Sequence, residues 1–311
     1  NVVYLKGRYI SKIIGTITGY LYRYRDLFTI SRYDIVYVHM WVTPLGSTLP
    51  ERLVRFLSKK LIYDIEDNTI TTVSSSVNRV IAPLKNSNKN KFLMKTADYV
   101  ITSSPALNSY CIDVNNNKKC KYISSSVNID RFLPVNTYSN NKKVTIGWTG
   151  TFSSKEYLDL LRSALITLKD RCDFKLIVIG NFEYKFPEMD VEVIKWSSKN
   201  EVKDMQKIDI GIYPLSDDPW VHGKSGLKAI QYMAFGLPVV ATNIGTTPKI
   251  IENMRNGLLV NSDREWVSAL EKLVKNPELR KTLGQEARKT IIDKYSINAI
   301  KIDYFSIISK L

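Results

Sequence analysis

The stretch DIGIYPLSDDPWVHGKSGLKAIQYMAFGLPVVATNIGTT, residues 209–247, contains the pattern that decides the fold. A β-rich run ends at Tyr213 and Pro214, a polar loop follows, and a helical pattern opens near Ser225. A second apolar run, rich in β-branched residues, occupies residues 239–242. A strand followed by a helix and a further strand is typical of a parallel sheet whose faces are covered by helices.

The same alternation extends in both directions from this stretch. Expected strands lie at residues 34–39, 60–65, 98–102, 144–149, 175–180, 191–195, 208–214, 239–242 and 257–260, with a weaker one at 121–124. Helical patterns occupy residues 51–60, 156–169, 199–207, 226–235, 247–253 and 264–275, and a last long helix begins at Pro277. In the helix at 51–60 we expect Leu53, Phe56 and Leu57 to form the apolar face. The sequence therefore predicts an α/β protein.

Domain organisation follows from the length and from one polar loop. A chain of 311 residues is long enough for two domains. The Asn- and Lys-rich segment 136–143 comes directly before a strongly patterned strand and helix. We therefore expect a first domain at residues 1–140 and a second at 141–311, with the last helix crossing back to the first domain.

Composition and charge exclude several classes of protein. Hydrophobic residues make up 44% and charged residues 24%, as in ordinary globular proteins, and no apolar run approaches the ~20 residues of a membrane-spanning helix. Three cysteines are too few for a disulfide framework or a structural zinc site, which favours a reducing, cytoplasmic compartment. The net charge of +15 is spread without a block of about five like charges, so we expect no nucleic-acid partner. An anionic membrane surface and phosphorylated ligands stay open.

Three polar residues lie on one face of the helix at 226–235 and just before it. Lys224, Lys228 and Gln231 are spaced i, i+4 and i+7. Like charges four residues apart repel by roughly 0.2–0.5 kcal/mol, and cations at a helix N-terminus face the positive end of its dipole. A bound diphosphate reverses both effects, because its oxygens accept from the lysines and from free backbone N–H groups. A solvated lysine face is the alternative, but a loop at the carboxyl end of a parallel strand favours a ligand.

A second candidate lies at the end of the strand at 144–149. Gly147, Gly150 and Thr151 form a turn of small residues, and Lys155 follows. Small residues let a phosphate or a ribose approach backbone N–H groups. A tight strand-to-helix turn explains the glycines equally well. This turn therefore indicates a ligand site only in combination with the lysine loop.

These segments resemble the donor domain of group 1 glycosyltransferases, the retaining GT-B enzymes of glycosyltransferase family 4. The resemblance rests on Gly150 with Lys155, on Tyr213-Pro214, and on the segments KAIQYMAFGLPVV (residues 228–240) and GTTPKIIENMRNGLLV (residues 245–260). In the first half, TADYVITSS (residues 96–104) and VNIDRF (residues 127–132) are also similar to family segments. The resemblance implies two Rossmann-like parallel-sheet domains that face a cleft.

The resemblance also implies roles for individual residues. Donor-binding roles fall on Gly150, Thr151, Lys155, Tyr213, Pro214, Gly223, Lys224, Lys228 and Gln231. Gly223 and Gln231 stand where the family usually has the two glutamates of a Glu-x7-Glu motif, and Thr151 lies in the region of a phosphate-binding arginine. With Trp220, these residues resemble a subgroup that has a Trp…Gly-Lys…Lys loop.

Three residues are implied to act in catalysis. Lys224 would take over charge stabilisation, and Asp217 or Asp218, of which we expect Asp218, would contact sugar hydroxyls. His39, at the end of the strand at 34–39, matches a family histidine that lies by the acceptor and the donor sugar. No metal ion is expected, because the lysines stabilise the departing diphosphate and no His or acidic cluster has metal-ligand spacing.

The implied reaction moves a sugar from a UDP- or GDP-linked donor to a hydroxyl of a glycan or lipid-linked acceptor, with retention. Bacterial surface polysaccharide or lipopolysaccharide synthesis, at the inner face of the membrane, is the expected setting. A catalytically inactive glycosyltransferase-like subunit and a GT-B sugar-nucleotide epimerase are the alternatives. Because family members have further βα units before the strand at 34–39, we also expect the first domain to lack its first units.

Overall fold

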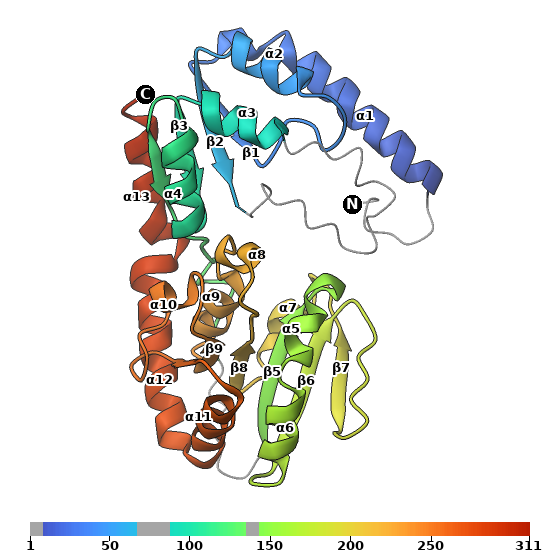
Figure 1. The fold of residues 1–311 in the computed structure, drawn as a ribbon, viewed down its shortest axis with the longest axis vertical. Coiled ribbons are helices and arrows are strands. Elements are labelled where there is room, and N and C mark those ends of the chain that lie inside the picture. Colours follow the sequence, from blue (N-terminus) through green and yellow to red (C-terminus); the bar gives the residue numbers. More distant parts are fainter. Residues whose placement is uncertain (1–8, 67–87, 135–142) are drawn as a thin grey trace. The chain divides into compact units, whose positions relative to one another are not determined.

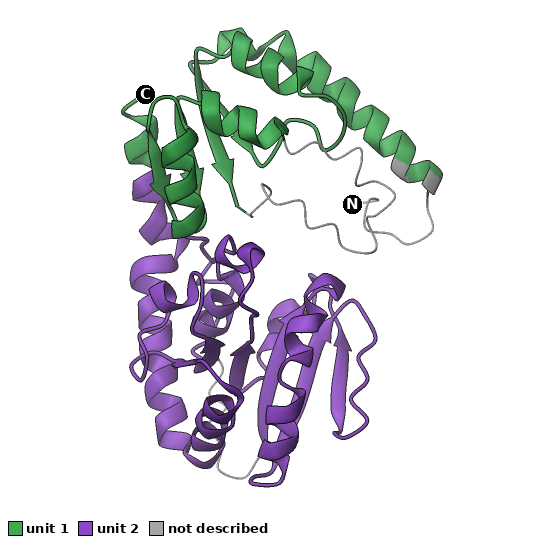
Figure 2. Ribbon diagram, in the orientation of Figure 1, with its two compact units in different colours: residues 1–123, 305–311 green, residues 124–304 purple. Residues whose placement is uncertain are grey.

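The computed structural model describes residues 9–66, 88–134 and 143–311 (Figure 1). The chain divides into two compact units, one formed by Asn1–Ile123 with Phe305–Leu311 and the other by Ser124–Tyr304 (Figure 2). Of the loop at 136–143, only residue 143 lies within the described part. The division therefore falls earlier in the chain than the expected limits of 1–140 and 141–311, and only the end of the last helix belongs to the first unit.

The segment that begins at Ser124 packs on the second unit, and this explains where the division falls. Val127 forms a parallel bridge with Ser296. The guanidinium of Arg288 donates hydrogen bonds to the backbone carbonyls of Phe132, at 2.7 Å, and of Ile129, at 2.9 Å. These hydrogen bonds attach the segment to the C-terminal helices of the second unit. The residues that form them are far apart in the sequence, so local patterns do not predict the contact.

The first unit contains a four-stranded parallel sheet in the order β1-β2-β3-β4. The strands are β1 Ile35–His39, β2 Lys60–Ile65, β3 Tyr99–Thr102 and β4 Cys120–Tyr122. The helices are α1 Tyr9–Leu27, α2 Leu49–Leu57, α3 Asn88–Thr96 and α4 Pro105–Val114, with a short 3-10 helix η2 at Ile30–Arg32. The central strands are the best buried, since Leu61, Tyr63 and Val100 are fully enclosed. The sheet register places His39 beside Asp64 on the neighbouring strand.

Helix α1 departs from the sequence-based expectation, which placed no element there. Its apolar residues recur at positions 10, 13, 14, 17 and 21, which is the spacing of one helical face. These five side chains are between 55% and 75% exposed. The face of α1 that turns to the rest of the unit carries Tyr20, whose hydroxyl donates to the carbonyl of Leu45 at 2.5 Å.

The second unit contains a six-stranded parallel sheet in the order β10-β9-β8-β5-β6-β7. The strands are β5 Val144–Gly150, β6 Phe174–Gly180, β7 Val191–Lys195, β8 Ile210–Tyr213, β9 Val239–Thr242 and β10 Leu258–Val260. Every strand expected from the sequence is therefore confirmed, with bounds within two residues. These strands are nearly continuous apolar runs because a parallel sheet is buried on both faces.

Helices cover both faces of this sheet, and two apolar clusters lie between helices and strands. The helices are α5 Lys155–Asp159, α6 Arg162–Lys169, α7 Glu201–Met205, α8 Pro219–His222, α9 Leu227–Ala234, α10 Thr247–Ile250, α11 Asp263–Lys275, α12 Pro277–Thr290 and α13 Ile297–Ile308. A 3-10 helix η5 lies at Phe152–Ser154 and a π-helical turn η6 at Ile291–Tyr295. Successive residues of β6 alternate between the two clusters: Ile177 joins the α9 cluster, and Leu176 joins the α6 cluster.

Two of the expected helices are interrupted. The expected helix at 156–169 is divided into α5 and α6, at the point where Asp159 accepts hydrogen bonds from Arg162 and from the hydroxyl of Tyr184, both at 3.0 Å. The last long helix is divided by η6, directly before the bridge that Ser296 forms with Val127. In both places a contact from a distant segment, rather than a helix-breaking residue, accompanies the interruption.

Candidate functional site

The sheet order of the second unit identifies one place that favours ligand binding. From β5 the chain proceeds to β6 on one side, and later returns to β8 on the other side. Such a reversal is the switch point at which open α/β sheets bind ligands, outside the carboxyl ends of their strands. β5 pairs with β8 only through Ile146 and Gly147, whereas it pairs with β6 as far as Gly150. The carboxyl end of β5 therefore separates from β8.

The loop after β8 is held by an aspartate that caps the next helix. Tyr213 and Pro214 are buried at the end of the strand. The carboxylate of Asp218 accepts from the backbone N–H of Val221 at 3.0 Å and from the hydroxyl of Ser216 at 2.5 Å. Both carboxylate oxygens thus hold the loop, which is the ordinary task of an N-cap residue. The role of Asp218 toward sugar hydroxyls stays a prediction, and any hydroxyl would share these oxygens.

Lys224 lies between helix α8 and helix α9, directly after Gly223, which is the C-cap of α8. Its ammonium lies over the ring of Tyr157, 4.1 Å from the ring centroid. The hydroxyl of Thr246 donates to the carbonyl of Lys224 at 2.6 Å and fixes its backbone. Burial and the nearby carboxylates of Asp218 and Glu156 raise the pKa of Tyr157 to about 12, although a hydrogen bond with Ser216 lowers it. The hydroxyl of Tyr157, whose ring contacts the Lys224 ammonium, therefore stays neutral at ordinary pH.

Lys228, in the first turn of α9, turns toward the end of β5. Its ammonium donates to the hydroxyl of Ser154 at 3.2 Å and lies 4.8 Å from the centroid of the Trp148 ring. Burial, and then repulsion by the charge of Lys224, lower the pKa of Lys228 to about 7. Among the described residues no carboxylate forms an ion pair with Lys228. A half-buried cation with so little compensation is well suited to an anionic ligand.

The turn after β5 is shaped by the same serine. The hydroxyl of Ser154 accepts from the backbone N–H of Thr151 at 3.0 Å and donates to its carbonyl at 3.1 Å. A Cβ added at Gly150 would lie 2.2 Å from the Trp148 ring and 2.7 Å from the Ser154 oxygen, so only glycine fits there. The exposed Thr151, the Gly150 backbone and Lys228 are thereby brought together.

Two residues expected to bind the donor are placed differently. Lys155 begins α5 with its ammonium 5.8 Å from the centroid of the Tyr184 ring, a ring that Arg162 also contacts. The Lys155 ammonium therefore contacts a ring beside α5 and α6, whereas the Lys228 ammonium contacts Ser154 and Trp148. Gln231 is half-buried one turn after Lys228 on α9, and its side chain forms no hydrogen bond with the residues that the structure describes. Donor binding by both residues stays a prediction.

Sequence reasoning missed one polar contact at the switch point. Tyr232 is completely buried in the core. Its hydroxyl, however, accepts a hydrogen bond of 2.7 Å from the backbone N–H of Thr149 in β5. Burial raises the pKa of Tyr232, so the hydroxyl is not ionised at ordinary pH. The signal in the sequence is Gly211 in β8, because a Cβ there would lie 2.5 Å from the Tyr232 ring.

His39 belongs to the first unit, at the exposed end of β1. Its Nε2 lies 3.8 Å from a carboxylate oxygen of Glu66, and the imidazole is about half exposed. Tyr37, two residues earlier on the same side of the strand, donates a hydrogen bond to Asp64. The strand end thus carries a histidine beside two carboxylates, and its role toward a substrate stays a prediction.

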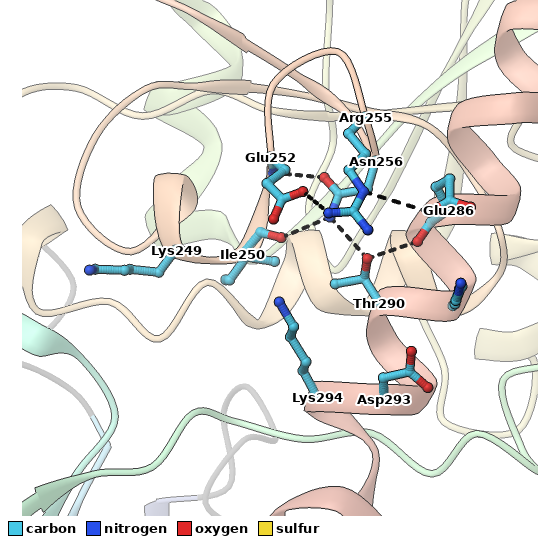
Figure 3. A pocket seen from close by; sticks show the side chains of 10 residues that line it. Lys249, Ile250, Glu252, Arg255, Asn256, Glu286, Thr290, Asp293 and Lys294 are labelled. Carbon is cyan, nitrogen blue, oxygen red and sulfur yellow. Dashed lines mark hydrogen bonds and ion pairs between the residues drawn. The ribbon is translucent and has the colours of Figure 1, made fainter.

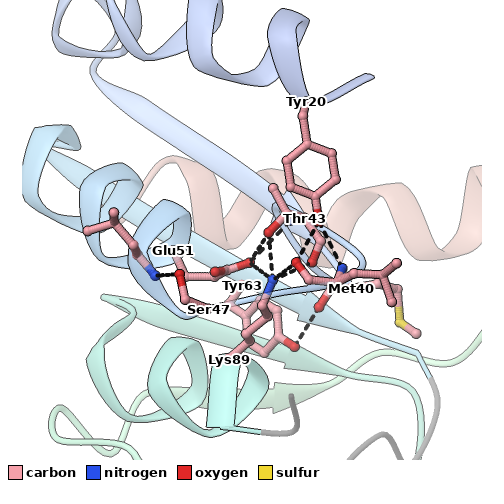
Figure 4. A network of polar contacts seen from close by, with 9 residues as sticks. Tyr20, Met40, Thr43, Ser47, Glu51, Tyr63 and Lys89 are labelled. Carbon is pink, nitrogen blue, oxygen red and sulfur yellow. Dashed lines mark hydrogen bonds and ion pairs between the residues drawn. The ribbon is translucent and has the colours of Figure 1, made fainter. Parts of the chain in front are cut away.

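A buried polar network holds the loop after His39 (Figure 4). The ammonium of Lys89 donates to the carbonyl and the hydroxyl of Thr43, at 3.0 and 2.6 Å, and to the carbonyl of Leu45 at 2.7 Å. Glu51 lies 3.7 Å from the same ammonium and accepts from the Thr43 N–H at 3.1 Å. Burial lowers the pKa of Lys89, and the charge of Glu51 opposes that effect. This lysine is therefore engaged entirely by protein groups.

A small cavity of about 70 Å³ lies elsewhere in the second unit, against α10, α12 and η6 (Figure 3). Its lining includes Lys249, Arg255, Glu286 and Lys294, and Arg255 forms ion pairs with Glu252 and Glu286. None of the residues expected to bind the donor lines it. Within the described parts of the chain, no group of three or more His, Cys, Asp or Glu side chains is arranged to hold a metal ion, and no helix there is both long and apolar enough to cross a membrane.

Comparison with known families gives a match over the second unit. Residues 131–290 match the family model described as glycosyl transferases group 1, which covers just over half of the chain. An uncharacterized glycosyltransferase of Methanocaldococcus jannaschii is 28% identical over 220 residues, which is 66% of this chain but only 59% of that relative. The capsular polysaccharide biosynthesis glycosyltransferase CapM of Staphylococcus aureus is 23% identical over 173 residues, 51% of this chain and 44% of CapM.

A solved structure extends the similarity to both units. The Anabaena protein HepE, solved in complex with UDP and glucose, superposes with a TM-score of 0.68 at 16% identity, over 93% of this chain and 81% of HepE. At this identity the likeness concerns the fold alone. It confirms the predicted GT-B class, with two parallel-sheet α/β domains.

Proposed function

Because the chain belongs to the group 1 glycosyl transferases, we propose that it transfers a sugar from a nucleotide-sugar donor to a hydroxyl of an acceptor, with retention of the anomeric configuration. The donor is a UDP- or GDP-linked sugar, and the reaction needs no metal ion. HepE, whose structure holds UDP and glucose, supports a nucleotide-sugar donor. The single observation that carries the proposal is the lysine pair, Lys224 and Lys228, at the switch point of the second unit.

Departure of the nucleoside diphosphate is the step that these lysines assist. As the bond from the anomeric carbon to the phosphate oxygen breaks, negative charge grows on the diphosphate, and preorganised donors at such a place contribute about 3 kcal/mol each. Lys224 and Lys228 supply those donors, and Lys228 does so beside the Gly150–Thr151 turn. The acceptor oxygen forms its bond to the same face of the sugar, and its proton passes to the departing phosphate oxygen.

A nucleotide-sugar screen tests the donor. UDP- and GDP-linked sugars are added singly, and the melting temperature of the protein is measured. A ligand at a hundred times its Kd stabilises the folded state by about 2.7 kcal/mol, so one donor class is expected to raise the melting temperature by several degrees. Absence of any shift across both nucleotide classes would contradict the proposal.

Transfer itself is tested with Lys224→Ala, using Lys272→Ala as a matched control on the exposed face of α11. The first variant is expected to lose transfer of the sugar while keeping its fold, and the control to keep both. Proton NMR of the product, which gives its anomeric configuration, tests retention. Unchanged turnover in folded Lys224→Ala protein would remove the role assigned to that lysine.

One observation favours a second candidate, a glycosyltransferase-like subunit without catalytic activity. Gly223 and Gln231 replace both carboxylates that the resemblance leads one to expect, and the described loop offers only Asp217 and Asp218 in their place. Asp218 caps α8, and Asp217 lies 3.1 Å from the ring nitrogen of His222. Nucleotide binding without transfer or donor hydrolysis would identify this candidate, and conversion of the donor without an acceptor would identify an epimerase.

For the acceptor, we propose a glycan or lipid-linked precursor of a surface polysaccharide at the cytoplasmic face of the membrane. CapM, a capsular polysaccharide biosynthesis glycosyltransferase, supports this setting. Helix α1 is the element suited to peripheral contact with an anionic lipid surface, because it combines its exposed apolar stripe with Arg23 and Arg25 near its C-terminal end. Each basic residue close to such a surface adds about 1 kcal/mol of attraction.

Vesicle co-sedimentation tests the membrane contact. Wild-type protein is expected to pellet with vesicles of phosphatidylglycerol and phosphatidylethanolamine, and less so as salt increases. The double variant Ile13→Ser with Ile17→Ser is expected to stay in the supernatant, whereas Ile302→Ser on α13 serves as an exposed apolar control. Equal binding by all three proteins would contradict a role for α1.

A further inference from the structure

The hydroxyl of Tyr232 occupies a position that a neighbouring strand would normally fill. Alternate residues of a strand offer their backbone groups to the same neighbour. In β5, Thr145, Gly147 and Thr149 turn toward β8: Thr145 exchanges backbone and carboxylate hydrogen bonds with Asp209, and Gly147 pairs with Gly211. At Thr149 the strands have separated, and the Tyr232 hydroxyl takes the N–H instead, at 2.7 Å.

The approach of Tyr232 to β5 requires the glycine in β8. The Tyr232 ring lies against Gly211, where an added Cβ would come within 2.5 Å of its Cγ and 2.9 Å of its Cβ. Those ring atoms belong to a fully buried side chain in the middle of α9, so they have little freedom to move. A glycine inside a strand generally marks such a close approach.

Tyr232 and Lys228 lie four residues apart and therefore on one face of α9. They bind the two ends of the same turn, because Tyr232 holds the N–H of Thr149 and Lys228 donates to the hydroxyl of Ser154. Ser154 in turn holds both backbone groups of Thr151. Helix α9 is thus attached to the β5 turn at two points, one on each side of Gly150.

We propose that Tyr232 is a positioning residue for nucleotide diphosphate binding, whose hydroxyl fixes the β5 turn so that Ser154 of this turn holds the Lys228 ammonium where the anion binds. This inference rests on the proposed function for its ligand, and on the Thr149 contact for its geometry. The residue does not itself reach the diphosphate. Its contribution is to keep the turn, and with it the Lys228 ammonium, in place, which matters because misplacement of such a donor by about 1 Å weakens its effect strongly.

Tyr232→Phe tests the inference, because it removes the hydroxyl and keeps the ring in its place over Gly211. Tyr295→Phe is the matched control: its hydroxyl also bonds to the backbone in the second unit, donating to the carbonyl of Lys249 at 2.9 Å. Affinity for UDP and for GDP is measured by calorimetry, exchange of the Thr149–Thr151 amides by mass spectrometry, and overall stability by urea unfolding.

Tyr232→Phe is expected to bind the preferred nucleotide about tenfold more weakly and to exchange the Thr149 amide at least about tenfold faster. Tyr295→Phe is expected to lose a similar amount of stability with unchanged affinity and unchanged exchange at this turn. Wild-type affinity in folded Tyr232→Phe protein, or equal losses in both variants, would overturn the inference. Binding of neither nucleotide by the wild type would instead contradict the proposed function, and unchanged amide exchange would then still overturn the role of Tyr232.

Discussion

Two lysines, one in each unit, differ in how far the surrounding protein groups compensate their charge. Lys89 is 2% exposed and is met by three protein oxygens and by the carboxylate of Glu51. Lys228 is half-buried and is met by one hydroxyl and an aromatic ring, with Lys224 as its charged neighbour. The Lys89 ammonium has its hydrogen bonds and its charge compensated by protein groups, as in a structural ion pair. Within the described part of the chain, the charge of the Lys228 ammonium is not compensated by a carboxylate, as in a site that binds an anion.

The largest effect is expected at Lys89. Replacing it by methionine leaves the Glu51 carboxylate buried without its cation, so Lys89→Met should lower the free energy of unfolding by about 3–5 kcal/mol. The double variant Lys89→Met with Glu51→Leu should recover much of this loss, because it removes the unpaired charge. Urea unfolding measures both, and a loss below about 1 kcal/mol in the single variant would show that the pair is not a structural unit.

At Lys228 the opposite behaviour is expected. Lys228→Met should not lower the free energy of unfolding, because it removes a poorly compensated charge from a half-buried place. It should weaken UDP or GDP binding about a hundredfold, since a charge-assisted contact to the diphosphate is lost. Calorimetry and urea unfolding distinguish the two effects, and a marked loss of stability with unchanged affinity would assign Lys228 a structural role like that of Lys89.

Gly211→Ala is expected to act at the same site without altering any polar group. The added Cβ would displace the Tyr232 ring, which should cost about 1–3 kcal/mol of stability and loosen the contact of its hydroxyl with Thr149. Thermal unfolding and amide exchange at Thr149 check this. An alanine tolerated at no cost would mean that α9 can move away from β8.

A separate effect is the dependence on pH. Because Lys228 has a pKa of about 7 in the folded protein, below its ordinary value, the unfolded chain binds more protons above pH 7. The free energy of unfolding should therefore increase with pH from about 7 toward 10, and Lys228→Met should lack this part of the increase.

Nucleotide affinity should change in the opposite direction, since the diphosphate prefers the charged lysine. It should decrease above pH 7 by up to about tenfold per unit, to a total of about a hundredfold, in wild type but not in Lys228→Met. Titrations of UDP or GDP across this range check the slope. Parallel slopes in the two proteins would show that another group titrates.

Much of the fold could be predicted, because the strands of a parallel sheet are contiguous apolar runs that the sequence displays directly. Helix α2 shows the limit of that reasoning. Phe56, expected on its apolar face, is 85% exposed, whereas Glu51 is fully buried. That expectation was wrong because Glu51 pairs with Lys89, which lies on a helix distant in the sequence. The ion pair makes burial of the Glu51 carboxylate possible.

The candidate site was only partly predictable for a similar reason. The spacing of Lys224 and Lys228 is local, but only Lys228 lies on α9 and contacts the end of β5, whereas Lys224 precedes the helix and lies over the Tyr157 ring. The role of the Tyr232 hydroxyl depends on Thr149, 83 residues earlier in the chain. Only the sheet order, which brings β5 beside β8, creates the gap that this hydroxyl fills. Lys155 is a further example, because the sequence around it does not indicate the Tyr184 ring that its ammonium contacts.

The central claim, that the lysine pair of the second unit binds a nucleoside diphosphate, is tested most directly by calorimetric titration of UDP and GDP. Wild-type protein and the double variant Lys224→Met with Lys228→Met are compared at about pH 6.5, where Lys228 is mostly charged. We expect one nucleotide to bind the wild type and to bind the folded double variant at least about a hundredfold more weakly. Equal affinity in the two proteins, or no binding of either nucleotide to the wild type, would contradict it.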